Sequence, residues 1–137
     1  EMVLEKDLSE NINYIGHVSD IDKLKGCFHS ADFFLYPSYY LEGFPRVVYE
    51  AMTIGMPIVC SVLRGMKGFM RDSVNCIEVP VRSPKVIAEK LMLLSEDITL
   101  RKSIGTHAKA DIAGYLKGIE HKSHSAQFVH ALDGVDV

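Results

Sequence analysis

The sequence lacks the features that mark several large classes of protein. Its 137 residues carry a net charge of −3, and no run of Lys or Arg is longer than two, whereas nucleic-acid surfaces need clustered basic residues. No apolar run approaches the roughly 20 residues of a membrane-spanning helix. The charged opening, residues 1–7, has no apolar core of the kind found in signal peptides. These absences predict a cytoplasmic protein that binds no nucleic acid.

Residues that commonly bind metals are few and poorly spaced. The three cysteines, Cys27, Cys60 and Cys76, form no Cys-x-x-Cys pair, which indicates buried thiols in a reducing cytoplasm. The six histidines form no metal-ligand spacing either. His121 and His124 share one helical turn, but a solvated helix explains them better than a metal does. We therefore expect no metal site.

Short apolar segments that resemble strands alternate with amphipathic segments that resemble helices. The expected strands span residues 11–16, 32–37, 56–61 and 76–79. The expected helices span residues 21–31, 45–55 and 119–132, with two more that begin at Pro84 and Asp97. Such alternation predicts an α/β fold, a Rossmann-like parallel sheet of four strands with helices on both faces. Because four strands are few for this class, we expect residues 1–137 to form a partial domain of a longer protein, truncated at its N-terminal edge.

The segment YYLEGFPRVVYEAMTIGMPIVC, residues 39–60, places two carboxylates eight positions apart in apolar surroundings. It follows the second expected strand, and open parallel sheets bind ligands outside the carboxyl ends of their strands. Glu42 precedes a turn, and Glu50 lies one turn inside the next helix, whose N-terminal end favours an anion. At about 100° per residue, Arg46, Glu50 and Thr53 share the polar face of that helix.

Two interpretations of Glu50 are open on spacing alone. Its carboxylate could accept hydrogen bonds from a pair of hydroxyls while a phosphate binds at the end of the helix. It could instead form an ordinary ion pair with Arg46 on a solvated face. Tyr36, Tyr39 and Tyr40 in the adjoining segment could flank a bound sugar or simply pack.

This segment resembles the signature of retaining GT-B glycosyltransferases of the glycosyltransferase 4 type. Their hallmark is Glu-x7-Glu, followed by Ala-Met, a Gly and a Pro-Ile/Val-Val strand. Here it reads from Glu42 to Glu50, then Ala51-Met52, then GMPIV at residues 55–59. The flanking stretches INYIGHVSDIDKLKGCFHSADFFLYPS, residues 12–38, and EDITLRKSIGTHAKADI, residues 96–112, extend the resemblance over roughly residues 11–112.

The resemblance implies the C-terminal, donor-binding half of an enzyme that transfers a sugar from a UDP-sugar or GDP-sugar to a glycan, lipid or other acceptor. It implies no metal and no other cofactor. Glu42 would be catalytic, near the donor sugar and diphosphate, and Glu50 would bind the ribose hydroxyls. The remaining residues implied to bind the donor are Gly43, Phe44, Pro45, Arg46, Val47, His17, Val18 and Gly65.

The sequence also departs from the family pattern. The acceptor-binding N-terminal domain and the basic pair for the diphosphate are absent, so we expect no sugar transfer by this chain alone. In the longer protein, peripheral association with the inner face of the membrane is a further option. The family's Asp-Gly-x-x-Gly turn reads DSVNC at residues 72–76, and Arg64-Gly65 stands where Gly-Gly is common. A non-catalytic nucleotide- or sugar-binding module and a flavodoxin-like interaction domain are therefore kept as alternatives.

Overall fold

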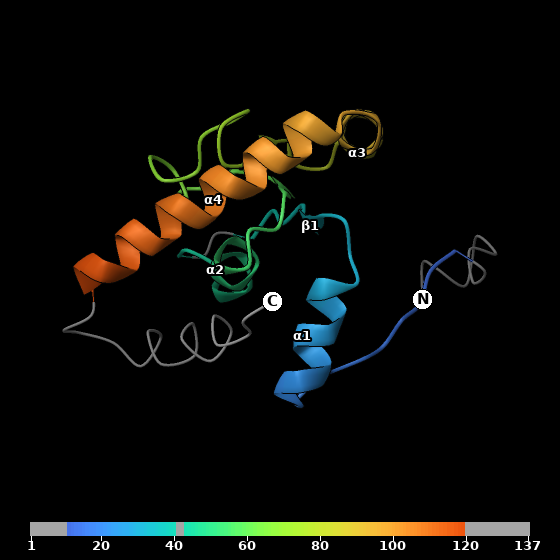
Figure 1. Cartoon of the computed structure of the whole chain (residues 1–137). Coiled ribbons are helices and arrows are strands. Elements are labelled where there is room, and N and C mark those ends of the chain that lie inside the picture. The colour runs from blue at the N-terminus through green and yellow to red at the C-terminus, as the bar shows by residue number, and fades with distance from the viewer. Residues whose placement is uncertain (1–10, 41–42, 120–137) are drawn as a thin grey trace.

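The computed structural model describes residues 11–40 and 43–119 (Figure 1). Its elements, in chain order, are α1 (Ile21–His29), β1 (Phe34–Tyr36), α2 (Arg46–Thr53), β2 (Ile58–Cys60), β3 (Ile77–Glu78), α3 (Pro84–Glu96) and α4 (Ile98–Ile119). The three strands form one parallel sheet in the order β1–β2–β3. The predicted α/β class and the parallel sheet are confirmed. None of the described helices is long and apolar enough to cross a membrane.

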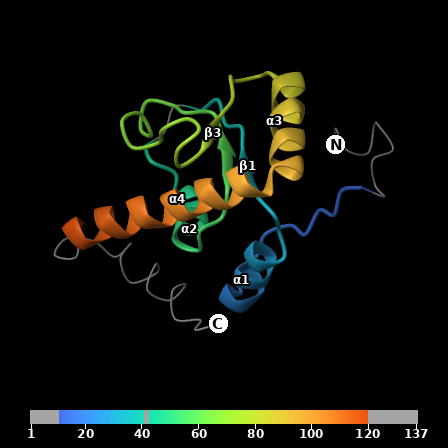
Figure 2. The ribbon, with the colours of Figure 1, turned by 45° about the horizontal axis from the view of Figure 1, so that its top comes forward.

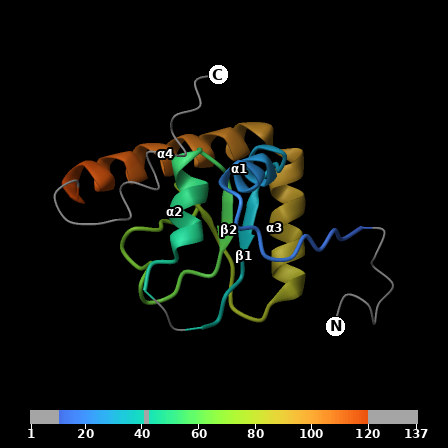
Figure 3. The same cartoon turned by 90° about the horizontal axis from the view of Figure 1, so that it is seen from below.

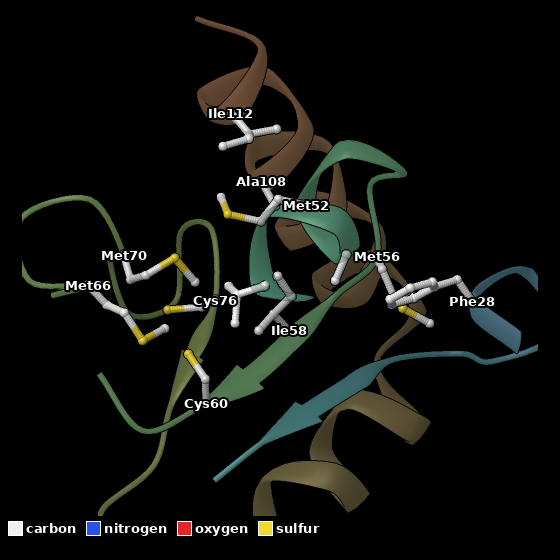
Figure 4. Close-up of a cluster of buried hydrophobic side chains, with 12 residues drawn as sticks. Phe28, Met52, Met56, Ile58, Cys60, Met66, Met70, Cys76, Ala108 and Ile112 are labelled. Atoms are coloured by element: carbon white, nitrogen blue, oxygen red, sulfur yellow. The ribbon is translucent and has the colours of Figure 1, made fainter. Parts of the chain in front are cut away.

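Helices cover both faces of the sheet, with α2 and α3 on opposite sides of the strands (Figure 3). On one face, Ile58 and Cys60 of β2 pack with α2 and the later part of α4 in a large apolar cluster (Figure 4). On the other face, Val59 and its register partner Ile77 pack with α3 and the beginning of α4. Because β2 is covered on both sides, all three of its residues are apolar and buried.

The predicted strand over residues 11–16 is wrong, so the sheet of described residues has three strands rather than four. Residues 12–20 have no regular secondary structure. Ile12, Tyr14 and Ile15 are exposed, so no part of the described chain covers the apolar surface whose burial normally stabilises a strand. The predicted helix over residues 119–132 lies outside the described residues, except for Ile119, the last residue of α4.

The long helix α4 lies across α2 (Figures 1 and 2). It begins after Asp97, whose Oδ1 accepts a hydrogen bond from the amide of Leu100 at 2.8 Å, as expected for a helix N-cap. The two helices meet most closely where Gly105 of α4 contacts the backbone of Gly55 at the end of α2. Gly55 has φ +73°, a left-handed conformation that glycine adopts without strain. The absence of a side chain at position 105 therefore sets how closely α4 approaches α2.

We expect Gly105→Ala to lower the free energy of unfolding by about 2 kcal/mol. A Cβ atom at this position would press on the carbonyl oxygen of Gly55, and overpacking costs about 1–3 kcal/mol. The control is Gly114→Ala in the same helix, where an added Cβ meets nothing within 4 Å, so the better helix propensity of alanine should raise stability by up to about 1 kcal/mol. Urea unfolding measures the change in unfolding free energy for both variants. If the two changes had the same sign, the close contact between Gly105 and Gly55 would be contradicted.

Candidate functional site

The candidate site lies where α2 begins, at the carboxyl end of the sheet. Residues 37–45 connect the end of β1 to α2, and the loop after β2 begins at the same edge with Ser61, whose amide donates to the carbonyl of Tyr36 at 3.2 Å. Pro45 is the N-cap residue of α2, and no side-chain hydrogen bond caps this helix. Glu42, the residue predicted to be catalytic, lies outside the described residues.

The carboxylate of Glu50 is buried, one turn inside the beginning of α2. Glu50 is only 6% exposed. Its Oε1 accepts a hydrogen bond from Nε of Arg46 at 3.0 Å, although the Arg46 side chain is 63% exposed. The ion pair between Arg46 and Glu50 is therefore present, but the Glu50 carboxylate does not lie on a solvated face. Thr53 on the same side is also buried, and its hydroxyl donates to the carbonyl of Tyr49 at 2.9 Å.

Burial changes the acid–base behaviour of Glu50. Desolvation raises the pKa of its carboxyl group, and the positive charge and hydrogen bond of Arg46 only partly oppose this rise. A partly desolvated carboxylate gains more from each hydrogen bond that it accepts than a carboxylate in water does. Glu50 is therefore suited to bind a pair of ligand hydroxyls at the entrance to α2.

The loop after β2 is held together by one buried amide side chain. Asn75 is fully buried; its Oδ1 accepts from the amide of Arg71 at 2.7 Å, and its Nδ2 donates to the carbonyl of Phe69 at 2.9 Å. Nδ2 also donates to Oδ2 of Asp111 on α4 at 2.8 Å, and the same oxygen accepts from Nη2 of Arg71 at 2.7 Å. Asn75 therefore closes the loop and joins it to α4.

The pKa of Asp111 reflects these contacts. Burial by itself would raise the pKa of this carboxyl group, but the hydrogen bonds from Arg71 and Asn75, with the charges of Arg71 and His107, outweigh that effect and lower it. Asp111 thus prefers its charged form. This network is not apparent from the sequence, because Asp111 and Asn75 are 36 positions apart.

The turn at residues 72–76 is held by hydrogen bonds although neither of its expected glycines is present. Ser73 has φ +58°, and its amide donates to the carbonyl of Cys76 at 2.8 Å. Oδ1 of Asp72 accepts from the amide of Glu78 at 2.8 Å. Ser73 thus adopts the left-handed conformation for which glycine is the usual residue, and the departure in sequence does not open the turn.

The other residues predicted to bind the donor are placed as follows. Gly43 is exposed, Phe44 is half-buried, Pro45 is buried and Val47 of α2 is half-buried. His17 and Val18 lie in the irregular segment before α1, and neither forms a hydrogen bond or ion pair with any described residue. Gly65 is exposed in a turn after β2. Only the segment from Gly43 to Glu50 is thus gathered at the start of α2, and the roles of these residues stay predictions.

Two exposed tyrosines lie in the connection between β1 and α2. The rings of Tyr39 and Tyr40 stack at 4.5 Å, and their hydroxyls are 3.2 Å apart. The guanidinium carbon of Arg82, in the turn after β3, lies 4.7 Å from the centroid of the Tyr39 ring. The loops that follow β1 and β3 therefore meet across the end of β2. Sequence analysis named both tyrosines but not Arg82, because nothing in the sequence links positions 39 and 82.

A parallel sheet with helices on both of its faces defines a Rossmann-like α/β domain. The family model for "Glycosyl transferases group 1" matches residues 1–111. The chain therefore belongs to the group 1 glycosyl transferases, and it corresponds to their C-terminal domain.

Curated relatives support the same assignment. The chain is 33% identical over 108 residues, 79% of its length, to an N,N'-diacetylbacillosaminyl-diphospho-undecaprenol alpha-1,3-N-acetylgalactosaminyltransferase of Campylobacter jejuni. It is 40% identical over 86 residues, 63% of its length, to O-antigen chain mannosyltransferase B of Escherichia coli. These matches cover 28% and 22% of the two relatives, so the chain spans less than a third of their length.

Solved structures share the fold. The C-terminal domain of the glycosyl transferase group 1 family protein LpcC from Francisella tularensis matches with a TM-score of 0.72 and 24% identity, covering 82% of this chain and 57% of that one. The Anabaena protein Alr3699/HepE, crystallised with UDP-glucose, matches with a TM-score of 0.76 and 21% identity, covering 94% of this chain and 34% of that one.

Proposed function

We propose that the chain is the donor-binding half of a retaining glycosyltransferase, which takes a UDP-sugar or GDP-sugar. The observation that carries this proposal is the buried carboxylate of Glu50, one turn inside a helix without a side-chain cap, at the carboxyl end of a parallel sheet. The family membership and the UDP-glucose complex of a structural neighbour support it.

Each part of the site has a distinct task in this proposal. Glu50 accepts hydrogen bonds from the two ribose hydroxyls. The diphosphate lies at the N-terminal end of α2, where the helix dipole and the first amides favour negative charge. Negative charge builds up on the diphosphate as the bond to the sugar breaks, so the same helix end stabilises the leaving group. Glu42, eight residues before Glu50 in the sequence, acts on the sugar in this proposal. The acceptor is bound by a further domain of a longer protein.

Calorimetric titration of the chain with UDP and with GDP tests the proposal. We expect one site with a dissociation constant between micromolar and millimolar for at least one of the two nucleotides. Uridine and guanosine are the matched controls, and they should bind at least tenfold more weakly because they have no phosphate for the end of α2. A folded chain that binds neither diphosphate at millimolar concentration would overturn the proposal.

The turn at residues 72–76 bears on the alternative of a degenerate, non-catalytic module. One ground for that alternative was the loss of both glycines, yet Ser73 adopts a left-handed conformation and its amide donates to the carbonyl of Cys76. The loop therefore gives no physical reason to expect loss of donor binding. Sugar transfer by the longer protein, abolished by Glu42→Ala, is the result that favours an enzyme over a binding module.

A further inference from the structure

Four aromatic rings close a cycle beside the start of α2. Phe44 stacks on Tyr49 with centroids 4.1 Å apart and meets Phe69 edge-on at 5.4 Å. Tyr115 completes the cycle, 5.9 Å from Tyr49 and 5.2 Å from Phe69. The rings come from four separate segments: the turn before α2, α2 itself, the loop after β2, and α4. We call these four residues the aromatic cycle.

One side of the aromatic cycle is anchored to rigid parts of the fold. On α4, Ala108 and Ile112 are buried in the apolar cluster that includes α2. Asp111, one helical turn before Tyr115, binds Arg71 and Asn75 and so fixes the loop that carries Phe69. Tyr115 is therefore attached to a helix whose position is set by packing and by a polar network.

The other side of the cycle is the turn that leads into α2. Gly43 has open space around it, and α2 has no side-chain cap, so neither restrains the turn. Phe44 makes two ring contacts, with Tyr49 and Phe69, and Tyr49 directly precedes Glu50. The aromatic contacts of Phe44, together with the burial of Pro45, therefore hold this turn against the body of the domain.

We propose that Tyr115 is a positioning residue of the donor site, acting through the aromatic cycle to hold residues 43–50 in place. This inference rests on the proposed function, because the site that is positioned is the one for the nucleoside diphosphate. Tyr115 does not itself contact that ligand. Its ring holds Tyr49 and Phe69, these two hold Phe44, and Phe44 holds the first turn of α2 with Glu50.

The exposure of Tyr115 makes this role separable from stability. Tyr115 is 43% exposed, so truncation of its side chain removes less buried apolar surface than the loss of a core residue would. The contact with Tyr49 is also polar: burial raises the pKa of the Tyr49 hydroxyl, and a hydrogen bond to Tyr115 raises it further. Tyr115→Phe keeps the ring and loses this hydroxyl, whereas Tyr115→Ala loses both.

Hydrogen exchange without any nucleotide tests the positioning directly. The amides of Val48 and Tyr49 both donate to the carbonyl of Pro45, and they report on the first turn of α2. We expect them to exchange roughly tenfold faster in Tyr115→Ala, near wild-type rates in Tyr115→Phe, and at wild-type rates in Tyr14→Ala, which removes a tyrosine that is 89% exposed. Amides of β2 should not change. If the amides of Val48 and Tyr49 exchange at wild-type rates in all three variants, the inference is overturned.

A double-mutant cycle on UDP binding provides the second test. Tyr115→Ala alone should weaken binding roughly 5- to 20-fold, but it should have little further effect in a Glu50→Ala background, because it acts by positioning Glu50. If the loss of affinity in the double variant equals the product of the losses in the two single variants, Tyr115 acts independently of Glu50, and this result would overturn the inference. If the wild-type chain binds neither UDP nor GDP, the proposed function fails, whereas the exchange rates still decide whether Tyr115 holds the turn.

Discussion

Replacing Glu50 with alanine will weaken the binding of UDP or GDP by roughly 10- to 150-fold. Hydrogen bonds to a charged group contribute about 1.5–3 kcal/mol, and every 1.4 kcal/mol is a factor of about ten in affinity. Because Glu50 is buried and its pKa is raised by desolvation, its carboxylate gains more from a pair of ribose hydroxyls than a solvated carboxylate could. Isothermal titration calorimetry of the wild-type chain and the variant measures the change.

Three further variants make this result specific. Glu50→Gln keeps the shape and loses the charge, so its affinity should fall between those of the wild-type chain and Glu50→Ala. Glu78→Ala removes an exposed carboxylate at the end of β3 and should bind like the wild-type chain. Glu42→Ala should also spare plain nucleotide binding, because Glu42 is proposed to act on the sugar. If Glu42→Ala abolished binding and Glu50→Ala did not, the two roles would be reversed.

Asn75→Ala will lower the free energy of unfolding by about 3 kcal/mol or more. The fully buried side-chain amide of Asn75 accepts a hydrogen bond from the backbone amide of Arg71 and donates one to the carbonyl of Phe69. A buried polar group left without a partner costs about 1–3 kcal/mol. The substitution also withdraws one of the two side-chain donors of Asp111. For a chain of this length we expect the midpoint of thermal unfolding to fall by roughly 10 °C.

The matched control is Asn13→Ala, which removes the same side chain from an exposed position. It should change the unfolding free energy by no more than about 0.5 kcal/mol. Asn75→Asp is a second test, because it retains an acceptor for Arg71 but places a carboxylate against Asp111, so the loss of stability should lessen as the pH is lowered and one carboxylate becomes protonated. An Asn75→Ala variant as stable as Asn13→Ala would show that the network contributes little.

The order of strands and helices could be predicted from the sequence because the core strands are nearly pure apolar runs. Residues 58–60 are apolar throughout, and only a strand covered on both faces needs that composition. Residues 11–16 also contain two isoleucines and a tyrosine, yet they form no strand. Local composition records what a segment could bury, whereas a strand forms only where neighbours are present to pair with it and cover it.

The site could be predicted only as far as it is local in sequence. The spacing of Arg46 and Glu50 indicated an ion pair one helical turn apart, and the structure contains it. Helical periodicity placed Glu50 and Thr53 on the polar face of the helix but could not show that both are buried, so the interpretation of Glu50 as part of a solvated face is wrong. The partners of Asn75 and the ring contacts of Tyr115 depend on how α4 crosses the domain, and no periodic pattern encodes that crossing.

The aromatic cycle also gives the chain an optical signal of its own. There is no tryptophan in the sequence, so circular dichroism between about 250 and 300 nm comes chiefly from the tyrosines and phenylalanines. Such a signal requires rings held in a fixed asymmetric environment, and Tyr49 and Tyr115 lie 5.9 Å apart with planes inclined by only 14°. Tyrosine ellipticity can therefore report on the order of the aromatic cycle without a label, separately from the helical signal in the far ultraviolet.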